Sequence, residues 1–230
     1  YQGIMASVMT DNAKASTEVA THMVESLGDA GQVVVIAHDS KSLTSQERVN
    51  NFIAEIQNNH PNMSVAGPYY MDQIDDIKKT IAEQQLDIVP VEGQELDEEQ
   101  QTALDDAIAQ ITDEDIYNYI LEMNPDVKGI FATNGDTTMQ ALTACEGKDM
   151  KDVVIMGYDA DQEEIDAMKD GRIAGMIVQN PYGMGYATVV AEARCVLNMG
   201  NEANVNTGYT WVTPDNIEDR TVQDILYAEK

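Results

Sequence analysis

Residues 153–185 constrain the fold of this chain more than any other segment. Residues 153–156 form a continuous apolar run, which is typical of a parallel strand buried on both faces. A helical segment follows, and a second apolar run occupies residues 174–178. This order predicts two parallel strands that end at the same edge of a sheet, followed by Asp159 and Gln179. In open α/β sheets, ligands bind at that edge. Neither Asp159 nor Gln179 has a nucleophile or general base beside it, so the pattern favours binding over catalysis.

The chain carries a large negative charge. Its 230 residues include 41 Asp and Glu but only 13 Lys and Arg, which gives a net charge of −28. Because nucleic-acid binding depends on Lys and Arg that neutralise phosphates, we expect no nucleic-acid partner. A hydrophobic content of 43% is enough for a substantial core, and no apolar run approaches the roughly 20 residues of a membrane span. The chain begins with Tyr1 and shows no signal peptide, so we expect a processed chain or part of a longer one.

Strand and helix patterns alternate along most of the chain. This alternation predicts an α/β fold with a doubly wound parallel sheet flanked by helices. The expected strands are residues 3–9, 32–37, 64–68, 128–132, 153–158, 174–178 and 209–212. The expected helices are residues 13–27, 45–59, 73–84, 137–145, 162–169 and 183–198. Thr44 and Glu47 fit a capping box for the second of these helices.

An acidic segment interrupts the alternation between about residues 85 and 125. Residues 92–126 contain twelve acidic residues and no Lys or Arg, yet the apolar residues from 104 to 111 keep a helical spacing. Thr112 and Asp115 fit the cap of a second helix. We expect two acidic amphipathic helices packed on the flank of the sheet. A calcium site is the alternative, but the segment has no D-x-D-x-D-G loop, and we expect no metal.

Six segments taken together carry a family resemblance. They are VMTDN, LGDAGQVVVIAH, SQERVNNFIAEIQNNHP, NPDVKGIFATN, GYDADQEEIDAMKDGRIAGMIVQNPYGMGYATVVAEA and TGYTWVTPDNI. Their combination resembles the type I periplasmic sugar-binding proteins of ABC importers, the ribose- and galactose-binding group. The lactose-repressor family shares this fold and many of these patterns. The resemblance covers nearly the whole chain except about residues 85–112.

The resemblance implies a division of the chain between two lobes. Members of the family bind a sugar between two lobes that are joined by three crossing strands. On that plan, residues 1–179 correspond to the C-terminal ligand-binding lobe, with the acidic helical insertion at about 85–125. Residues 180–207 belong to the N-terminal lobe, and residues 208–230 form the return crossing and the C-terminal tail. Most of the N-terminal lobe is then absent, so we expect half of a binding site and an exposed apolar face that drives self-association.

The resemblance also assigns polar side chains to the sugar. It implies that Arg48, Asn134, Asp159 and Gln179 bind sugar hydroxyls through a guanidinium fork, two amides and a carboxylate, all groups suited to hydroxyl partners. Each residue has a structural alternative. Arg48 would otherwise form a surface ion pair, Asn134 and Asp159 would cap helices, and Gln179 would bond to the backbone at a hinge.

Two residues are candidates for the side chain that stacks on the sugar ring. The family's stacking residue aligns with Tyr70 or Met71, and a tyrosine there would equally suit half-buried packing. The family usually has Asp after the asparagine that binds sugar, whereas Gly135 follows here and changes the local loop. The three histidines do not cluster in the sequence, so we expect no catalytic residues. Cys145 and Cys195 fit buried apolar positions, with a disulfide as the alternative.

These patterns predict an extracytoplasmic solute-binding protein, either periplasmic or lipid-anchored on the outer face of the cell membrane. It would capture a monosaccharide or polyol, deliver it to an ABC permease and need no cofactor. One alternative is the effector-binding domain of a lactose-repressor-type transcription regulator, and another is a ligand sensor that feeds a membrane kinase. An enzyme is the least favoured class, because the chain lacks a Gly-rich phosphate loop.

Overall fold

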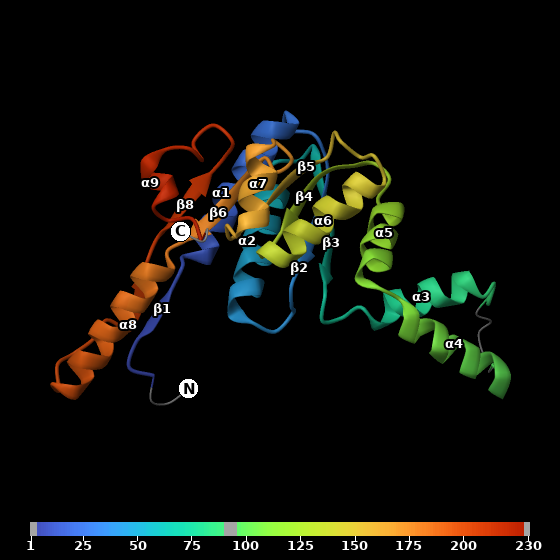
Figure 1. The fold of residues 1–230 in the computed structure, drawn as a ribbon, viewed down its shortest axis with the longest axis horizontal. Coiled ribbons are helices and arrows are strands. Elements are labelled where there is room, and N and C mark those ends of the chain that lie inside the picture. Colours follow the sequence, from blue (N-terminus) through green and yellow to red (C-terminus); the bar gives the residue numbers. More distant parts are fainter. Residues whose placement is uncertain (1–3, 90–95, 228–230) are drawn as a thin grey trace.

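The centre of the molecule is a six-stranded sheet in the order β3-β2-β4-β5-β6-β8, seen in a computed structural model that describes residues 4–89 and 96–227 (Figure 1). The first five strands are parallel and β8 is antiparallel. This arrangement confirms the predicted α/β fold with a mostly parallel sheet. The strands are β1 (Ser7–Met9), β2 (Gly31–Ala37), β3 (Met63–Tyr70), β4 (Val127–Ala132), β5 (Val154–Tyr158), β6 (Gly175–Gln179), β7 (Asn204–Asn206) and β8 (Tyr209–Val212).

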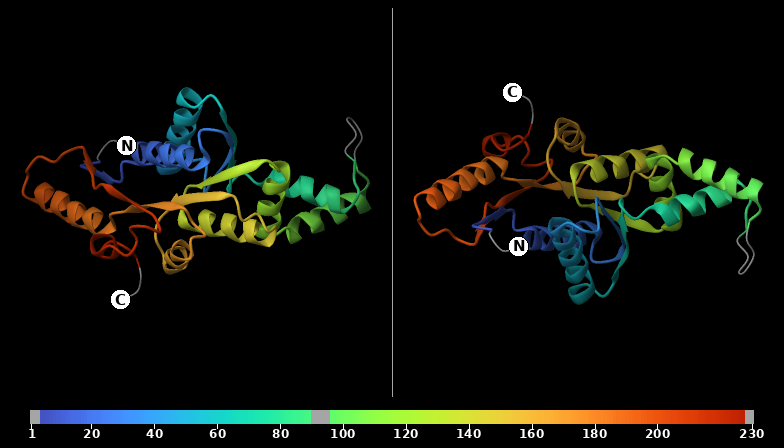
Figure 2. Two further views of the ribbon diagram at one scale, coloured as in Figure 1. Left: turned by 90° about the horizontal axis from the view of Figure 1, so that it is seen from above. Right: turned by 90° about the horizontal axis from the view of Figure 1, so that it is seen from below.

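Helices cover both faces of this sheet (Figure 2). They are α1 (Asn12–Leu27), α2 (Leu43–Asn59), α3 (Asp75–Gln85), α4 (Glu98–Gln110), α5 (Asp113–Met123), α6 (Gly135–Gly147), α7 (Gln162–Lys169), α8 (Pro181–Val196) and α9 (Arg220–Gln223). The predicted capping box of α2 is wrong, because α2 begins two residues earlier than expected. Ser42 caps it by accepting from the N–H of Ser45, in a loop that Asp39 orders by accepting from the N–H groups of Lys41 and Ser42. None of the described helices is long and apolar enough to span a membrane.

Alternate residues of β2 serve two separate cores, as the two-residue period of a strand requires. Val33 and Val35 pack with α1 and α2 on one face, where the ring centroids of Phe52 and Phe131 are 4.3 Å apart. Val34 points to the other face, into a core that includes residues of α5, α6, α7 and the C-terminal tail. A sheet that is buried on both faces exposes its ligand-binding groups only at its edges.

The two acidic helices have different surroundings. The Thr112–Asp115 capping box is confirmed, and the buried residues of α5 join the core. In α4, however, Leu104 is the one side chain described as buried, and the helix lies against α3. Figure 2 shows α3 and α4 extending beyond the sheet. The expectation that both helices pack on the flank of the sheet is therefore wrong for α4, which has too few apolar residues to bury a face.

The chain passes three times through a narrow region that we call the neck, residues 9–10, 179–180 and 206–208. The N–H of Thr207 donates to the carbonyl of Met9 (3.1 Å), and Asn180 Nδ2 donates to the carbonyl of Thr207 (3.1 Å). Beyond the neck, β1 pairs with β7, a three-residue strand that the sequence does not predict, and α8 flanks them. The strand expected at residues 3–9 is shorter, and residue 3 lies outside the described residues.

Candidate ligand-binding site

A buried arginine organises the carboxyl edge of the sheet. Arg48, in α2, is 5% exposed. Its Nε donates to Asn12 Oδ1 (2.8 Å), Nη1 donates to the carbonyl of Thr133, and Nη2 donates to Gln179 Oε1 (3.2 Å). Its Cζ also lies 3.9 Å from the ring centroid of Tyr158. Arg48 is therefore not a surface ion pair, and these three bonds leave two of its five N–H groups for another partner.

Asp159 follows β5 and accepts two hydrogen bonds. Oδ1 accepts from Gln179 Nε2 (2.7 Å), and Oδ2 accepts from the N–H of Gly135 (3.2 Å). Asp159 has a φ of 79°, a left-handed conformation that costs a non-glycine residue about 1 kcal/mol and that is common at functional sites. The cap of α7 is Asp161, so the helix-cap alternative does not hold for Asp159.

Gln179 joins the other two side chains. Its Oε1 accepts from Arg48 and from Thr10 Oγ1 (3.0 Å), while its Nε2 donates to Asp159. All three of these partners are side chains, so the predicted alternative, a hydrogen bond to the backbone, is wrong. Arg48, Gln179 and Asp159 form one chain of hydrogen bonds, which we call the polar triad. The triad presents a cation, an amide and a carboxylate at one edge of the sheet.

Asn134 lies beside the triad and acts as a helix cap. Its Oδ1 accepts from the N–H of Thr137 (3.1 Å) and from Thr137 Oγ1 (2.6 Å), so the structure bears out the cap alternative for this oxygen. No described residue accepts from its amide nitrogen. The next residue, Gly135, donates to Asp159, and this bond brings Asn134 to the triad through the backbone.

Tyr70 and Met71 lie further away, at the end of β3. Neither hydrogen-bonds with the triad among the described residues. Tyr70 packs against the core that contains α1 and α2, and Met71 packs against the opposite core. The preceding residue, Tyr69, accepts from Asn124 and is part of the fold. The structure thus assembles the polar part of the predicted site and leaves the choice of stacking residue open.

Several residues at this edge were not among the predicted site residues. They are Thr10, Asn12, Thr133, His38 and Tyr227. His38 Nδ1 lies 2.8 Å from Thr133 Oγ1, and burial lowers the pKa of this imidazole, so it is neutral at neutral pH. Tyr227 donates its N–H to the carbonyl of Ala160, and burial together with the nearby Asp159 raises the pKa of its hydroxyl. Asn12 is the last residue of the VMTDN motif and the first of α1, but the motif does not distinguish it from its neighbours.

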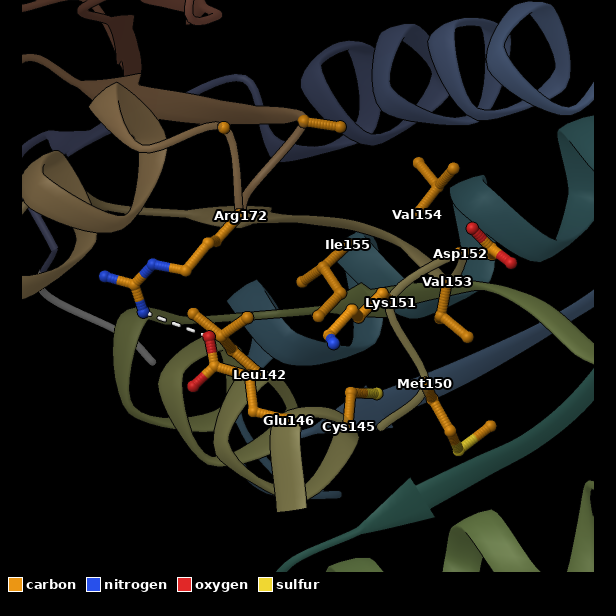
Figure 3. A pocket seen from close by; sticks show the side chains of 12 residues that line it. Leu142, Cys145, Glu146, Met150, Lys151, Asp152, Val153, Val154, Ile155 and Arg172 are labelled. Atoms are coloured by element: carbon orange, nitrogen blue, oxygen red, sulfur yellow. Dashed lines mark hydrogen bonds and ion pairs between the residues drawn. The ribbon is translucent and has the colours of Figure 1, made fainter. Parts of the chain in front are cut away.

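A separate pocket of about 420 Å³ lies at the opposite edge of the sheet (Figure 3). It is formed by the end of α6 and the residues that begin β5 and β6, including Leu142, Cys145 and Ile155. Arg172 and Glu146 form an ion pair at this pocket, with 3.2 Å between nitrogen and oxygen. None of the six predicted site residues lines this pocket, so its position does not support a role as the sugar site. Both cysteines are free thiols, and no three metal-ligating side chains gather in the described part of the chain.

Comparisons with known proteins agree with this architecture. A family model described as "Periplasmic binding protein domain" matches residues 3–195. The ribose import binding protein RbsB of Bacillus subtilis (strain 168) is 21% identical over 178 residues, a region that covers 77% of this chain and 46% of that protein. This chain therefore spans less than half the length of that relative.

Solved structures show the same fold. An ABC transporter solute-binding protein from Agrobacterium vitis, with bound D-fucose, has a TM-score of 0.74 and 24% identity. The match covers 97% of this chain and 65% of that one. A carbohydrate transporter solute-binding protein from Agrobacterium radiobacter, in complex with D-arabinose, has a TM-score of 0.73 and 22% identity, with coverage of 96% and 65%. The matched structures are about one and a half times as long as this chain.

Proposed function

Because the chain belongs to the periplasmic binding protein domain family, as its sequence predicts, we propose that it forms the sugar-binding part of an extracytoplasmic solute-binding protein. The observation that carries this proposal is the polar triad at the carboxyl edge of the sheet. Arg48 donates in a fixed plane, Asp159 accepts strongly, and Gln179 does both. Neighbouring hydroxyls of a monosaccharide or polyol need this mixture of donors and acceptors, and binding them requires no covalent step.

The proposed mechanism is closure around the neck. Thr10 and Gln179 lie in the neck and hydrogen-bond to each other, and Gln179 also belongs to the triad. A ligand that engages the triad would therefore contact the place where the chain bends. Hinge closure around a ligand is an established motion of two-lobed binding proteins. We propose that the closed form delivers the sugar, chemically unchanged, to an ABC permease.

We further propose that residues 180–207 are part of a second lobe in a longer protein. Apart from its two ends in the neck, this segment lies beyond the neck (Figure 1), and α8 buries none of its described side chains. Tyr182 is 84% exposed and Val189 is 65% exposed, far more than apolar residues of a finished core. Such an exposed apolar helix is typical of a surface that another part of the protein covers.

The exposed face of α8 predicts that this chain associates with itself. Val189→Glu places a charge on that face and is expected to shift the chain toward monomer by about tenfold in dissociation constant, since burying an unpaired charge is unfavourable. Sedimentation velocity over a range of concentrations measures the shift. Thr102→Glu, on the exposed side of α4, is the control and is expected to change nothing. Identical association of all three proteins would contradict the role of α8.

The proposed function is tested by calorimetric titration of the complete protein that contains this chain. The panel is D-ribose, D-arabinose and D-fucose, with other pentoses and hexoses for breadth. Binding of one sugar with a dissociation constant of about 1 µM or less is expected, and much weaker binding by this chain alone. A folded complete protein that binds no sugar would overturn the proposal.

A further inference from the structure

Glu164 is a buried acid without a counterion. It lies in the first turn of α7 and is only 1% exposed, although the neighbouring Glu163 is exposed as usual. Its Oε2 accepts from the N–H of Asp161 (3.0 Å). Its Oε1 is buried and has no hydrogen-bond partner among the described residues. A carboxylate in this position would be a buried and only partly satisfied charge, which is strongly unfavourable.

The Glu164 carboxyl group packs against the turn that approaches the polar triad. A Cβ atom built on Gly135 would lie 2.9 Å from Glu164 Oε2 and 3.2 Å from Oε1. The carboxyl group therefore occupies the space that a side chain at position 135 would need. The N–H of Gly135 is the group that donates to Asp159 Oδ2. Gly135 is thus held between Glu164 on one side and Asp159 on the other.

This packing favours glycine at position 135. The family resemblance leads one to expect Asp after Asn134, yet a side chain there would need the buried Glu164 carboxyl group to move. In this chain the carboxyl group of Glu164, from α7, fills the space beside Gly135, whose N–H donates to Asp159.

The charged groups near Glu164 oppose its ionisation. Asp159 and Asp161 face it from the loop between β5 and α7, and burial together with these charges raises the pKa of Glu164 to about 8. Asp136, in the first turn of α6, is exposed. The tail contributes Tyr227, whose hydroxyl pKa is raised, so it adds no charge. The cation Arg48 is the other end of the triad, joined to Asp159 through Gln179.

We propose that Glu164 is a positioning residue for the sugar site, and that its uncharged carboxyl group holds the Asn134–Gly135 turn against Asp159. This inference rests on the proposed function, in which Asp159 binds the sugar. Ionisation of Glu164 adds a charge beside Asp159 and Asp161, so the carboxyl group leaves its place and the turn loosens. Sugar affinity then falls as the pH rises through about 8.

The sign of the effect on folding follows from the same shift. The pKa of Glu164 is raised from 4.5 in the unfolded chain to about 8 in the folded protein, so the folded state binds the extra proton. The stability contributed by this proton is fully present below pH 4.5 and is lost as the pH rises through about 8.

The test is sugar titration of the complete protein at about pH 6.5 and about pH 9, with Glu164→Gln beside the wild type. The amide of Gln keeps the shape of the neutral acid and cannot ionise. We expect the wild type to bind about tenfold more weakly at the higher pH, whereas Glu164→Gln changes less than about twofold. Glu163→Gln removes a charge from the same helical turn and should keep the pH dependence of the wild type.

A second measurement needs no sugar. The NMR signal of the Gly135 amide should titrate near pH 8 in the wild type and stay constant in Glu164→Gln. Equal pH profiles of affinity, or a Gly135 signal that titrates alike in both proteins, would overturn the positioning role while sugar binding stands. A Gly135 signal that differs as expected, in a protein that binds no sugar, would overturn the proposed function and confine Glu164 to shaping the turn.

Discussion

Asp159→Asn should weaken sugar binding by the complete protein at least about 30-fold, and Asp159→Ala by about 100-fold or more. Asp159 accepts from both Gly135 and Gln179, and a hydrogen bond to a charged group contributes about 1.5–3 kcal/mol. An amide at this position has one oxygen in place of two, so its NH₂ group would face a donor. Each tenfold loss of affinity corresponds to about 1.4 kcal/mol, and calorimetric titration measures it directly.

Asp161→Asn is the matched control for this prediction. It removes the same charge from the same loop, two residues further on, where Asp161 is exposed and caps α7. Asn is as good an N-cap as Asp, so sugar affinity should stay within about twofold of the wild type. If both Asn variants lose sugar affinity equally, the charge of the loop matters and the contact of Asp159 does not. If both keep the affinity of the wild type, Asp159 has no role in binding.

Arg48→Ala is expected to lower the free energy of unfolding by about 3 kcal/mol and to abolish sugar binding. The substitution leaves Asn12 Oδ1 and the carbonyl of Thr133 without a donor, and Gln179 Oε1 keeps only its bond from Thr10. The cost is roughly 1 kcal/mol for each of the three lost bonds. Arg48→Lys keeps the charge but reaches only one of these acceptors, so about 2 kcal/mol should be lost. Urea unfolding, followed by the fluorescence of the single tryptophan, measures both values.

Arg172→Ala separates burial from charge in this comparison. Arg172 forms ion pairs with Glu146 (3.2 Å) and Asp170 (3.4 Å), but its side chain is 38% exposed. Exposed ion pairs contribute little, so the free energy of unfolding should fall by less than about 1 kcal/mol. Equal losses for the two alanine variants would show that the buried position of Arg48 adds nothing.

Continuous apolar runs made most of the sheet predictable. The strands β4, β5 and β6 were placed within one residue at each end, and β8 was placed at its observed bounds. Buried parallel strands carry an uninterrupted apolar pattern that few loops share. The strand β7 has no such pattern, because it consists of Asn204, Val205 and Asn206. Its partner, β1, lies almost two hundred residues earlier in the chain, so local sequence holds no sign of the pairing.

The site was predictable only where a strand ends in a polar side chain. Asp159 and Gln179 met this condition, and the structure joins them by a hydrogen bond. The other two hydrogen-bond partners of Arg48 did not meet it. One is the backbone carbonyl of Thr133, which any residue possesses, and another is Asn12, at the start of a helix that the family motif reaches but does not mark. The sequence gives no sign that Glu164 is buried, since burial of a charged residue type leaves no trace in the residue pattern.

The threefold passage of the chain through the neck limits how the two ends of the molecule can move. A single linker bends, twists and slides in any direction, whereas three strands bonded to one another must deform together. Twisting would shear the hydrogen bonds that join Thr207 to Met9 and Asn180 to Thr207. Bending about one axis across all three strands keeps them intact. The neck therefore restricts the motion to rotation about a single axis, and one distance measured across it describes the whole motion.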